Sequence, residues 1–502
     1  MINKPFPATR GTIVQQAQVG GLNNFDVLVV GQKIGGTATA GALIENIISE
    51  SEVNTYFGRT SHIAKLLRAV LKDFNKSTVK SKLSAISLAD NGITKATGTF
   101  TITGTATEQG TLIFYVDSKT NGKFAIDVLS GETATQVGAK LQTAVTNYLN
   151  RNYSASNTTG TVTITALNAG TNGNTILLDF EGSVAGLTVA KSADYLASGA
   201  TDPVLTGLFD VIADQSFKFI VYPATYNYEF ISDYTNDNFN VTRGLKYSTA
   251  IQTKVDTYSN LSALYALYPT DKAVLRGRLH PDFLVENPDV MSAQLASKLS
   301  LFLTPDADVD FAQDITKGAI KNIGLPYAQL VFNDIQPLPT GTGFSKEENE
   351  VLDGLGSFTF YNNESNTAVL LGELFTGSVK DDLGIDNDTF KYQSTVDGVT
   401  YSRRFILKSL QSQFQRYKLT TGVAGDRLAS YGTMKSAIMR LYKQLAQEYG
   451  ILIDDNNLFT DVENVIDQTA VIDLGAGSYA TTLRLYLVGQ VRFIDITFVV
   501  KI

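Results

Sequence analysis

Alternation of apolar and polar residues marks the end of this chain. From Ile494 to Ile502 the even-numbered positions are all apolar, whereas Asp495, Thr497 and Lys501 occupy the other face. This period of two predicts a β-strand with one buried face. Such an apolar strand is either closed into a sheet of its own subunit or donated to a neighbouring subunit. Its candidate contact residues are Phe493, Ile494, Ile496, Phe498, Val500 and Ile502.

The earlier part of the chain alternates between buried-type strands and helices. Residues 25–30 form an apolar run followed by a glycine turn at 31–36, and residues 61–74 have the 3.6-residue period of a helix. A second run at 217–222 is followed by alternating strands and helices up to about residue 361. This alternation predicts an α/β layer. Thr201-Asp202-Pro203 predicts the start of a further helix.

Two segments interrupt or follow this layer. Residues 97–197 are rich in Thr, Gly and Asn, with short alternating strands and a helix at 134–148, which predicts an inserted β-rich domain. Residues 381–398 are acidic and predict a loop. Two amphipathic helices follow, with apolar stripes from Leu407 to Tyr417 and from Met434 to Leu445, and Gly450 fits the end of the second.

We therefore expect a multidomain protein of the α+β or α/β class. The predicted units are an extended arm at 1–24 with a strand containing Thr12, Ile13 and Val14, and a discontinuous central α/β domain at 25–96 and 198–390. The inserted domain spans 97–197, a C-terminal α+β domain spans 391–484, and a strand arm spans 485–502. A chain of 502 residues is long enough for several cores.

The composition excludes several classes of function. The chain has no cysteine, which excludes disulfides, thiolate metal sites and cysteine nucleophiles. Its net charge of −8 argues against bulk binding of nucleic acid. It has neither the apolar core of a signal peptide nor an apolar stretch of about 18 residues, so we expect a soluble protein made in the cytosol, without membrane insertion.

Candidate catalytic and binding motifs are weak. His62 lies at a predicted helix start, where we expect a surface or capping residue, and His280 precedes Pro281-Asp282. No Gly-x-Ser-x-Gly elbow accompanies them, so a hydrolase centred on His280 is only the alternative hypothesis. The glycine turn at 31–36 has Thr37 where a phosphate-binding loop needs Lys. The carboxylates at 306–310 lack the Gly and Glu that a calcium loop needs at its sixth and twelfth positions. With neither motif complete, we expect no metal and no cofactor.

Positive charge is concentrated in one window. The segment from Tyr401 to Lys443 contains nine basic residues and a single acidic residue, Asp426. It therefore carries a net charge of +8 in a chain whose net charge is −8. It is either a solvated helix face or a surface that attracts an acidic protein partner. The nine residues are Arg403, Arg404, Lys408, Arg416, Lys418, Arg427, Lys435, Arg440 and Lys443.

Several segments together resemble one protein family. They are Tyr56-Phe-Gly-Arg59, Gly104-Thr-Ala106 with Gly110–Tyr115, Ser130–Ala134, Val162–Ala166 with Asn168–Asn174, Glu348-Asn349, and the C-terminal segments Thr433–Ile451 and Val491–Phe498. In this order they resemble the contractile bacteriophage tail sheath proteins of the Mu-like and myovirus type.

The resemblance implies a structural protein and no enzyme. It implies hexameric rings stacked into a helical sheath around a tail tube, which contracts without nucleotide to drive the tube through the host envelope. The terminal strands would link neighbouring subunits, and the basic window would face the tube. The implied partners are further copies of the chain, the tube, the baseplate and the tail terminator; the place is the virion tail, assembled in the host cytoplasm. A sheath of a non-viral contractile injection system stays open.

Overall fold

We describe the fold from a computed structural model. It describes residues 25–75, 81–90, 94–212, 215–239, 247–283, 286–303, 323–325, 327, 331–332, 343–362, 368–371, 373–414, 416–420, 428–455, 465–466, 471–473, 478–487 and 493–501. The coarse prediction is confirmed, because the chain is a mixed α/β protein with several separate sheets.

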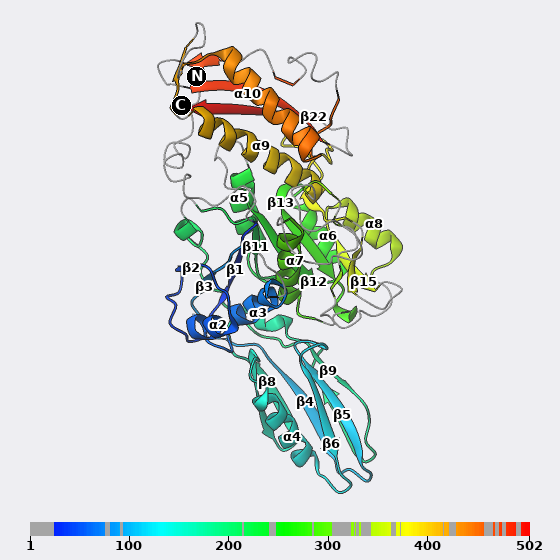
Figure 1. Cartoon of the computed structure of the whole chain (residues 1–502). Helices are drawn as coiled ribbons and strands as arrows, with labels where there is room; N and C mark the ends of the chain where they lie inside the picture. Colours follow the sequence, from blue (N-terminus) through cyan, green and yellow to red (C-terminus); the bar gives the residue numbers. More distant parts are fainter. Residues whose placement is uncertain are drawn as a thin grey trace.

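A seven-stranded sheet forms the centre of the molecule (Figure 1). Its inner strands are parallel, and only the two edge strands are antiparallel. Every residue of β1 and β3 is buried, as expected for a parallel sheet covered on both faces. In spatial order the strands are β17 (Thr376–Ser378), β13 (Thr270–Leu279), β12 (Thr249–Val255), β11 (Phe219–Val221), β1 (Val27–Gln32), β3 (Leu83–Leu88) and β2 (Leu43–Ile44).

Alternate residues of β1 enter two different cores. Val27 and Val29 pack with helices α3 (His62–Phe74) and α7 (Pro288–Leu303). Leu28 and Val30 pack on the other face, in the cluster that contains helix α5 (Tyr228–Phe239). The remaining elements of this part are α2 (Glu50–Phe57), α6 (Tyr258–Ala266), α8 (Lys346–Gly354), the short helices η2 (Asp210–Ile212) and η4 (Pro281–Phe283), and the small sheet of β14 (Val331–Phe332), β16 (Ala368–Leu371) and β15 (Thr359–Asn362).

The segment between β3 and β11 forms a second body with its own core (Figure 1). Its helix α4 (Ala134–Asn147) begins with a capping box, because Thr133 and Gln136 satisfy each other's backbone N–H groups. One sheet consists of β10 (Leu187–Lys191), β4 (Thr97–Gly104), β8 (Thr161–Ala166) and β7 (Tyr153–Thr158), with η1 (Thr171–Thr175) after β8. The other sheet consists of β6 (Lys123–Val128), β5 (Gly110–Val116) and β9 (Leu178–Glu181).

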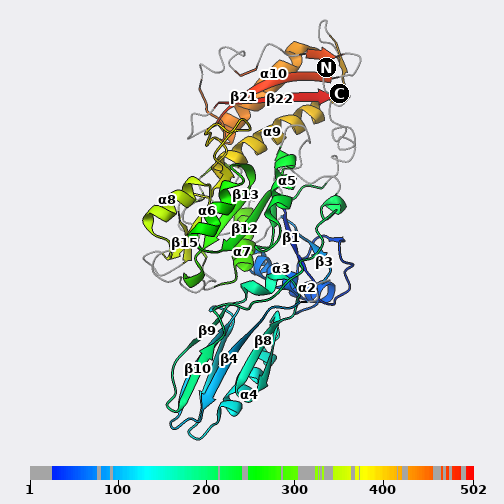
Figure 2. The same cartoon turned by 180° about the vertical axis from the view of Figure 1, so that it is seen from behind.

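A third body lies at the opposite end of the central sheet (Figures 1 and 2). Helices α9 (Gln393–Phe414) and α10 (Tyr431–Lys443) pack against each other, and a π-helical turn at Gln444–Glu448 extends α10. Alongside them lie the sheet of β20 (Val471–Asp473), β21 (Ser478–Tyr486) and β22 (Phe493–Lys501) and the two-stranded pair β18 (Lys418–Leu419) and β19 (Leu428–Ala429).

Two local predictions are wrong. No helix begins at residue 201; Thr201 has a left-handed φ of 69°, and Asp202 accepts hydrogen bonds from the backbone N–H and hydroxyl of Thr171 instead of capping a helix. The predicted loop at 381–398 ends early, because α9 already begins at Gln393, and its predicted stripe residue Tyr417 lies beyond the end of the helix. The predicted strand at 12–16 lies outside the described residues.

Strand β13 carries a buried charge network. The guanidinium of Arg276 is fully buried, lies 3.3 Å from Asp271 and donates from Nε to the hydroxyl of Tyr228 at 2.6 Å. The Tyr228 hydroxyl in turn donates to the Asp271 carboxylate. Each charge therefore depends on the other for its compensation.

We predict that Arg276→Leu lowers the free energy of unfolding by about 3–5 kcal/mol, because the Asp271 carboxylate would stay buried without its cation. Urea unfolding followed by circular dichroism measures this loss. The exposed Arg416→Leu serves as control and is expected to change stability by less than about 0.5 kcal/mol. A loss below about 1 kcal/mol for Arg276→Leu would contradict the argument.

Candidate assembly surfaces

The C-terminal strand pairs within its own chain. β22 runs antiparallel to β21 over its whole length, with Leu485 opposite Ile494 and Leu483 opposite Ile496. Phe498 and Val500 also have partners on β21, and Ile502 lies outside the described residues, as do Thr12, Ile13 and Val14. In the strand order β20–β21–β22, no described strand pairs with the second edge of β22.

The neighbouring strand β21 is fixed in the C-terminal core. Leu483 and Leu485 are fully buried in the main apolar cluster, and the backbone N–H of Tyr486 donates to the hydroxyl of Tyr442 on α10. Helix α9 lies beside β22. Strand β21 is therefore fixed in the C-terminal core, and it pairs with β22 along its whole length.

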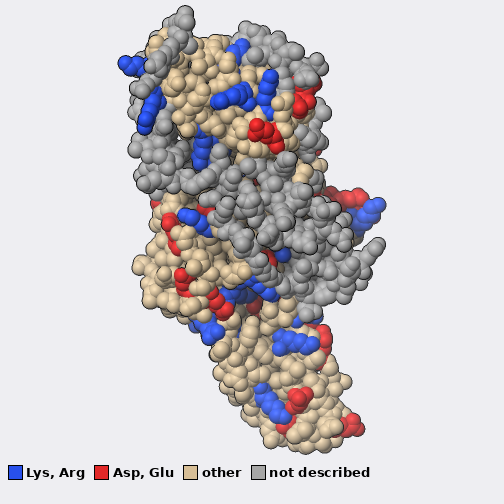
Figure 3. Space-filling view, in the orientation of Figure 1, with Lys and Arg blue, Asp and Glu red and all other residues tan. Residues whose placement is uncertain are grey.

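The basic window divides into buried and exposed members. Arg403 is buried, Arg404, Lys408 and Lys435 are half-buried, and Arg427 lies outside the described residues. Arg416, Lys418, Arg440 and Lys443 are exposed. Figure 3 shows Lys and Arg side chains gathered on the C-terminal body. The side chain of Arg440 donates to Gln413 at the end of α9 at 2.8 Å, and Lys435 lies over the ring of Tyr431.

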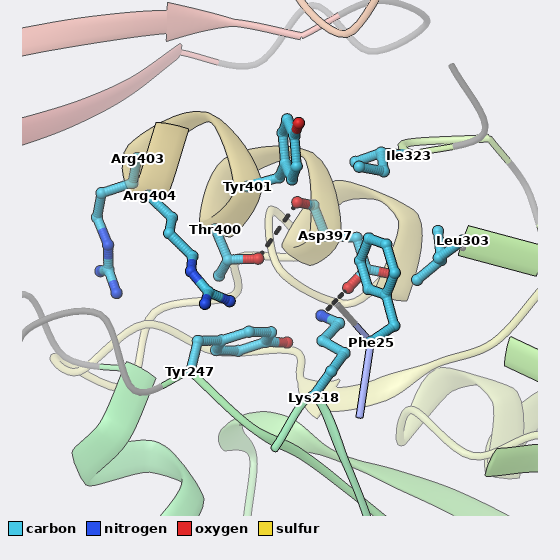
Figure 4. A pocket seen from close by; sticks show the side chains of 10 residues that line it. All are labelled: Phe25, Lys218, Tyr247, Leu303, Ile323, Asp397, Thr400, Tyr401, Arg403 and Arg404. Atoms are coloured by element: carbon cyan, nitrogen blue, oxygen red, sulfur yellow. Dashed lines mark hydrogen bonds and ion pairs between the residues drawn. The ribbon is translucent and has the colours of Figure 1, made fainter. Parts of the chain in front are cut away.

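Buried charged residues, among them Arg403 of the basic window, hold α9 against the central body (Figure 4). Lys218, directly before β11, pairs with Asp397 on α9, whose other oxygen accepts from the hydroxyl of Tyr327 at 2.5 Å. Arg403 donates to the backbone oxygen of Phe239 at 3.0 Å. These groups line a small pocket together with Arg404, Tyr247 and Phe25. Arg403 is therefore enclosed by its own chain, whereas Arg416, Lys418, Arg440 and Lys443 are exposed.

Burial also affects the titration of this cluster. It lowers the pKa of Arg403 to about 10 and that of Lys408 to about 8, where the neighbouring Arg404 adds to the effect. Burial lowers the pKa of Lys218 as well, against the opposing attraction of Asp397. Removing a cation from water lowers its pKa, and here the cations lose contact with water because α9 packs against the central body.

The two histidines have structural surroundings. His62 is buried, so its predicted place at the surface is wrong: its Nε2 lies 2.9 Å from the fully buried Asp289 on α7. Its Nδ1 lies 3.5 Å from the side-chain amide of Asn172. His280 accepts from the backbone N–H of Asp282 at 3.2 Å, and its ring meets that of Phe344 edge-on. Asp282 supplies an oxygen only at 3.7 Å, a distance too long for the hydrogen bond that would orient His280 as a base.

A buried polar junction joins the inserted body to the carboxyl ends of the central strands. Gln32, the last residue of β1, donates to the backbone oxygen of Ala169 at 2.9 Å, and Asn172 donates to the hydroxyl of Tyr226 at 3.0 Å. Near α7, Glu286 accepts from the hydroxyl of Ser118 at 2.8 Å. The partners are more than 50 residues apart, so the sequence contains no local signal for this junction.

The same junction contains a polar pocket. It has a volume of about 260 Å³ and lies between α3, α7 and the inserted body. Lys65 forms an ion pair with Asp117 at 2.5 Å beside Glu286. Burial raises the pKa of Glu286 to about 7, although the charge of Lys65 acts in the other direction. Among the described residues, no group of carboxylates and histidines can hold a metal ion, and no helix is long and apolar enough to cross a membrane.

Comparison with known proteins finds a similar sequence among the tail sheath proteins. No family model matches the chain. The Mu-like prophage FluMu tail sheath protein of Haemophilus influenzae is 23% identical over 452 residues, which cover 86% of this chain and 85% of that protein. The chain is a relative of the phage tail sheath proteins. The resemblance predicted from the sequence is thus confirmed.

Two solved structures are also similar to this chain. The sheath tail protein of Desulfitobacterium hafniense is 12% identical, with 96% of this chain and 98% of that chain covered and a TM-score of 0.49. The sheath tail protein of Listeria innocua is 13% identical, with 99% of both chains covered and a TM-score of 0.49.

We predict that the polar junction weakens as the pH rises. Because burial raises the folded-state pKa of Glu286 from 4.5 to about 7, the folded protein binds this proton more tightly than the unfolded chain. The carboxyl group therefore contributes stability at low pH that is lost as the pH rises through about 7. Relative to the wild type, Glu286→Gln is expected to gain about 2–3 kcal/mol between pH 4.5 and pH 8.

Urea unfolding across this pH range measures the difference. The exposed Glu108→Gln is the matched control, for which we expect a constant difference from the wild type. A Glu286→Gln curve that runs parallel to the wild type at all pH values would contradict the assignment.

Proposed function

We propose that this protein is the structural subunit of a contractile tail sheath. Its copies would polymerise as hexameric rings into a helical sheath around a tail tube, and contraction would drive the tube through the host envelope for genome delivery. The observation that carries the proposal is the sequence match to the FluMu tail sheath protein over most of both chains. A sheath of a non-viral contractile injection system is the second candidate, because such sheaths would need the same assembly surfaces.

The carboxyl edge of the parallel sheet is covered, and this supports a structural role without catalysis. In open α/β sheets ligands bind in the crevice at this edge. Here the edge is covered by the inserted body, and the buried side-chain amide of Asn172 contacts Gln32, His62 and Tyr226, which are buried as well. The chain combines the sheet of an α/β enzyme with a covered crevice, which disfavours the hydrolase alternative.

We further propose that β22 links the subunits. Its pairing with β21 uses backbone hydrogen bonds, which a β22 from any copy can supply equally well. Exchange of this strand between copies would keep every backbone hydrogen bond of the pair, and each chain would then be held to its neighbour through that hydrogen-bonded strand. The N-terminal residues Thr12, Ile13 and Val14 are proposed as the second arm, and rigid-body movement of the linked subunits would then produce contraction.

We propose that Lys435, Arg440 and Lys443 on α10 and Lys408 on α9, which are half-buried or exposed, face an acidic tube. The other implied partners are the baseplate and the tail terminator. The corresponding place is the virion tail, assembled in the cytoplasm of the bacterial host.

A disulfide placed across the two strands tests the exchange, because the chain has no other cysteine. Thr482 and Thr497 are directly opposite each other in the β21–β22 register, within the separation that a disulfide spans. We predict that oxidised Thr482→Cys/Thr497→Cys runs as a single chain when taken from dilute monomer and as a covalent ladder when taken from the assembly. Electrophoresis without reductant separates the two.

The matched control is Thr111→Cys/Asp127→Cys, a register pair in the inserted body that should stay within one chain under both conditions. If the assembled Thr482→Cys/Thr497→Cys protein also gave only single chains, β22 would remain in its own subunit and the exchange would be refuted.

A further inference from the structure

One turn of the molecule presents two large apolar side chains to solvent. It follows β17 at the edge of the central sheet and comprises residues 379–388. Leu383 is 85% exposed and Ile385 is 61% exposed, although both are large aliphatic residues. Between 381 and 390 the sequence contains four aspartates and no basic residue. The turn therefore combines an apolar tip with an acidic rim.

The turn is rigid rather than a loosely held loop. Asp381 accepts from the backbone N–H groups of both Leu383 and Ile385, at 2.9 and 3.0 Å. The backbone of Asp381 and Ile385 closes the turn with a 2.8 Å hydrogen bond, and Gly384 takes the left-handed φ of 80° that the turn requires. The side chains of Leu383 and Ile385 are thus held outward before any partner arrives.

The turn is also anchored to the central sheet. The backbone N–H groups of Val379 and Lys380 both donate to the carbonyl of Pro269, directly before β13. Lys272 on β13 lies 3.1 Å from the carboxylate of Asp382. An apolar pair on such a fixed support loses little conformational entropy on binding, which is the property of an interface anchor.

The C-terminal body of the same chain carries positive charge beside apolar side chains, which complements the acidic rim and apolar tip of the turn. Arg416 and Lys418 are exposed and lie beyond the end of α9. Lys418 is paired in register with Leu428, which is 36% exposed, and Tyr417 between the two cations is half-buried. We call Arg416, Tyr417, Lys418 and Leu428 the basic apolar patch. It offers cations for an acidic rim and apolar surface for an aliphatic tip.

We propose that the turn 379–388 docks on the basic apolar patch of a second copy of this chain. The proposal rests on the self-assembly proposed above. Leu383 and Ile385 would lose their exposed apolar surface to the patch, while the aspartates would meet Arg416 and Lys418. A copy that both carries the turn and offers the patch makes a head-to-tail contact, which generates rings or helical stacks. The cations on α10 remain available to the tube.

Sedimentation velocity and negative-stain microscopy of the full chain test the contact. We expect Leu383→Ser/Ile385→Ser to need at least about tenfold more protein for assembly than the wild type, since a buried anchor pair is lost. Leu129→Ser is the matched control, because Leu129 is 59% exposed and lies in the inserted body directly after β6, and we expect no change. Circular dichroism and melting of each monomer verify that these exposed substitutions leave the fold intact.

Charge reversal identifies the partner. Asp386→Lys/Asp388→Lys and Arg416→Glu/Lys418→Glu should each weaken assembly, and the variant that carries all four substitutions should restore it, because both sides of the contact are then reversed. If the fourfold variant stays as weak as the separate ones, the turn docks elsewhere, for example on the tube protein, and the proposed partner is wrong.

The outcomes separate this inference from the proposed function. Wild-type tubes together with an unchanged Leu383→Ser/Ile385→Ser variant would overturn the inference and leave the sheath proposal standing. Wild-type oligomers that are not tubular, but are lost in this variant and restored by the fourfold reversal, would support the contact and count against the sheath. A wild type that stays monomeric at every concentration, and also after addition of the tube protein from the same particle, would overturn both.

Discussion

The parallel sheet must be covered on both faces and at both ends, and the rest of the molecule is arranged around that requirement. β1 places Val27 and Val29 in one core and Leu28 and Val30 in another, so helices are needed on both sides. At the carboxyl ends Gln32 and Tyr226 bond to the inserted body, and at the amino ends Lys218 bonds to Asp397 on α9. The three bodies are thus joined through the sheet by buried polar contacts, which transmit orientation more strictly than apolar contacts.

What the chain leaves uncovered is equally informative. Within the described residues, the outer edge of β22 and the turn that carries Leu383 and Ile385 are surfaces whose physical chemistry calls for a partner. One offers backbone hydrogen bonds and the other an apolar anchor with an acidic rim. A protein that assembles with copies of itself can satisfy both without any further component, which fits a family of sheath subunits.

The sequence predicted those elements whose contacts are local. The helix at 61–74 follows from its 3.6-residue period, and the helix that begins at Ala134 is stabilised by the Thr133–Gln136 capping box, so the contacts that define both helices lie within a few residues. His62 was misplaced because its partner Asp289 lies 227 residues further along the chain. The missing helix at Thr201 has the same cause, since Asp202 bonds to Thr171.

The candidate surfaces show the same limit. The charges between Tyr401 and Lys443 can be counted in the sequence. The burial of Arg403 cannot be predicted in this way, because its guanidinium bonds to the backbone of Phe239, more than 160 residues away. The terminal strand was recognisable because its period of two lies within nine residues. The position of its partner strand, and the exposure of Leu383 and Ile385, depend on the packing of distant segments.

Negative-stain electron microscopy of the purified full-length protein, across protein concentration and salt, tests the central claim most directly. The account predicts hollow, striated tubes of uniform width built from this chain alone. A monodisperse monomer under all conditions, including after addition of the tube protein from the same particle, would contradict it.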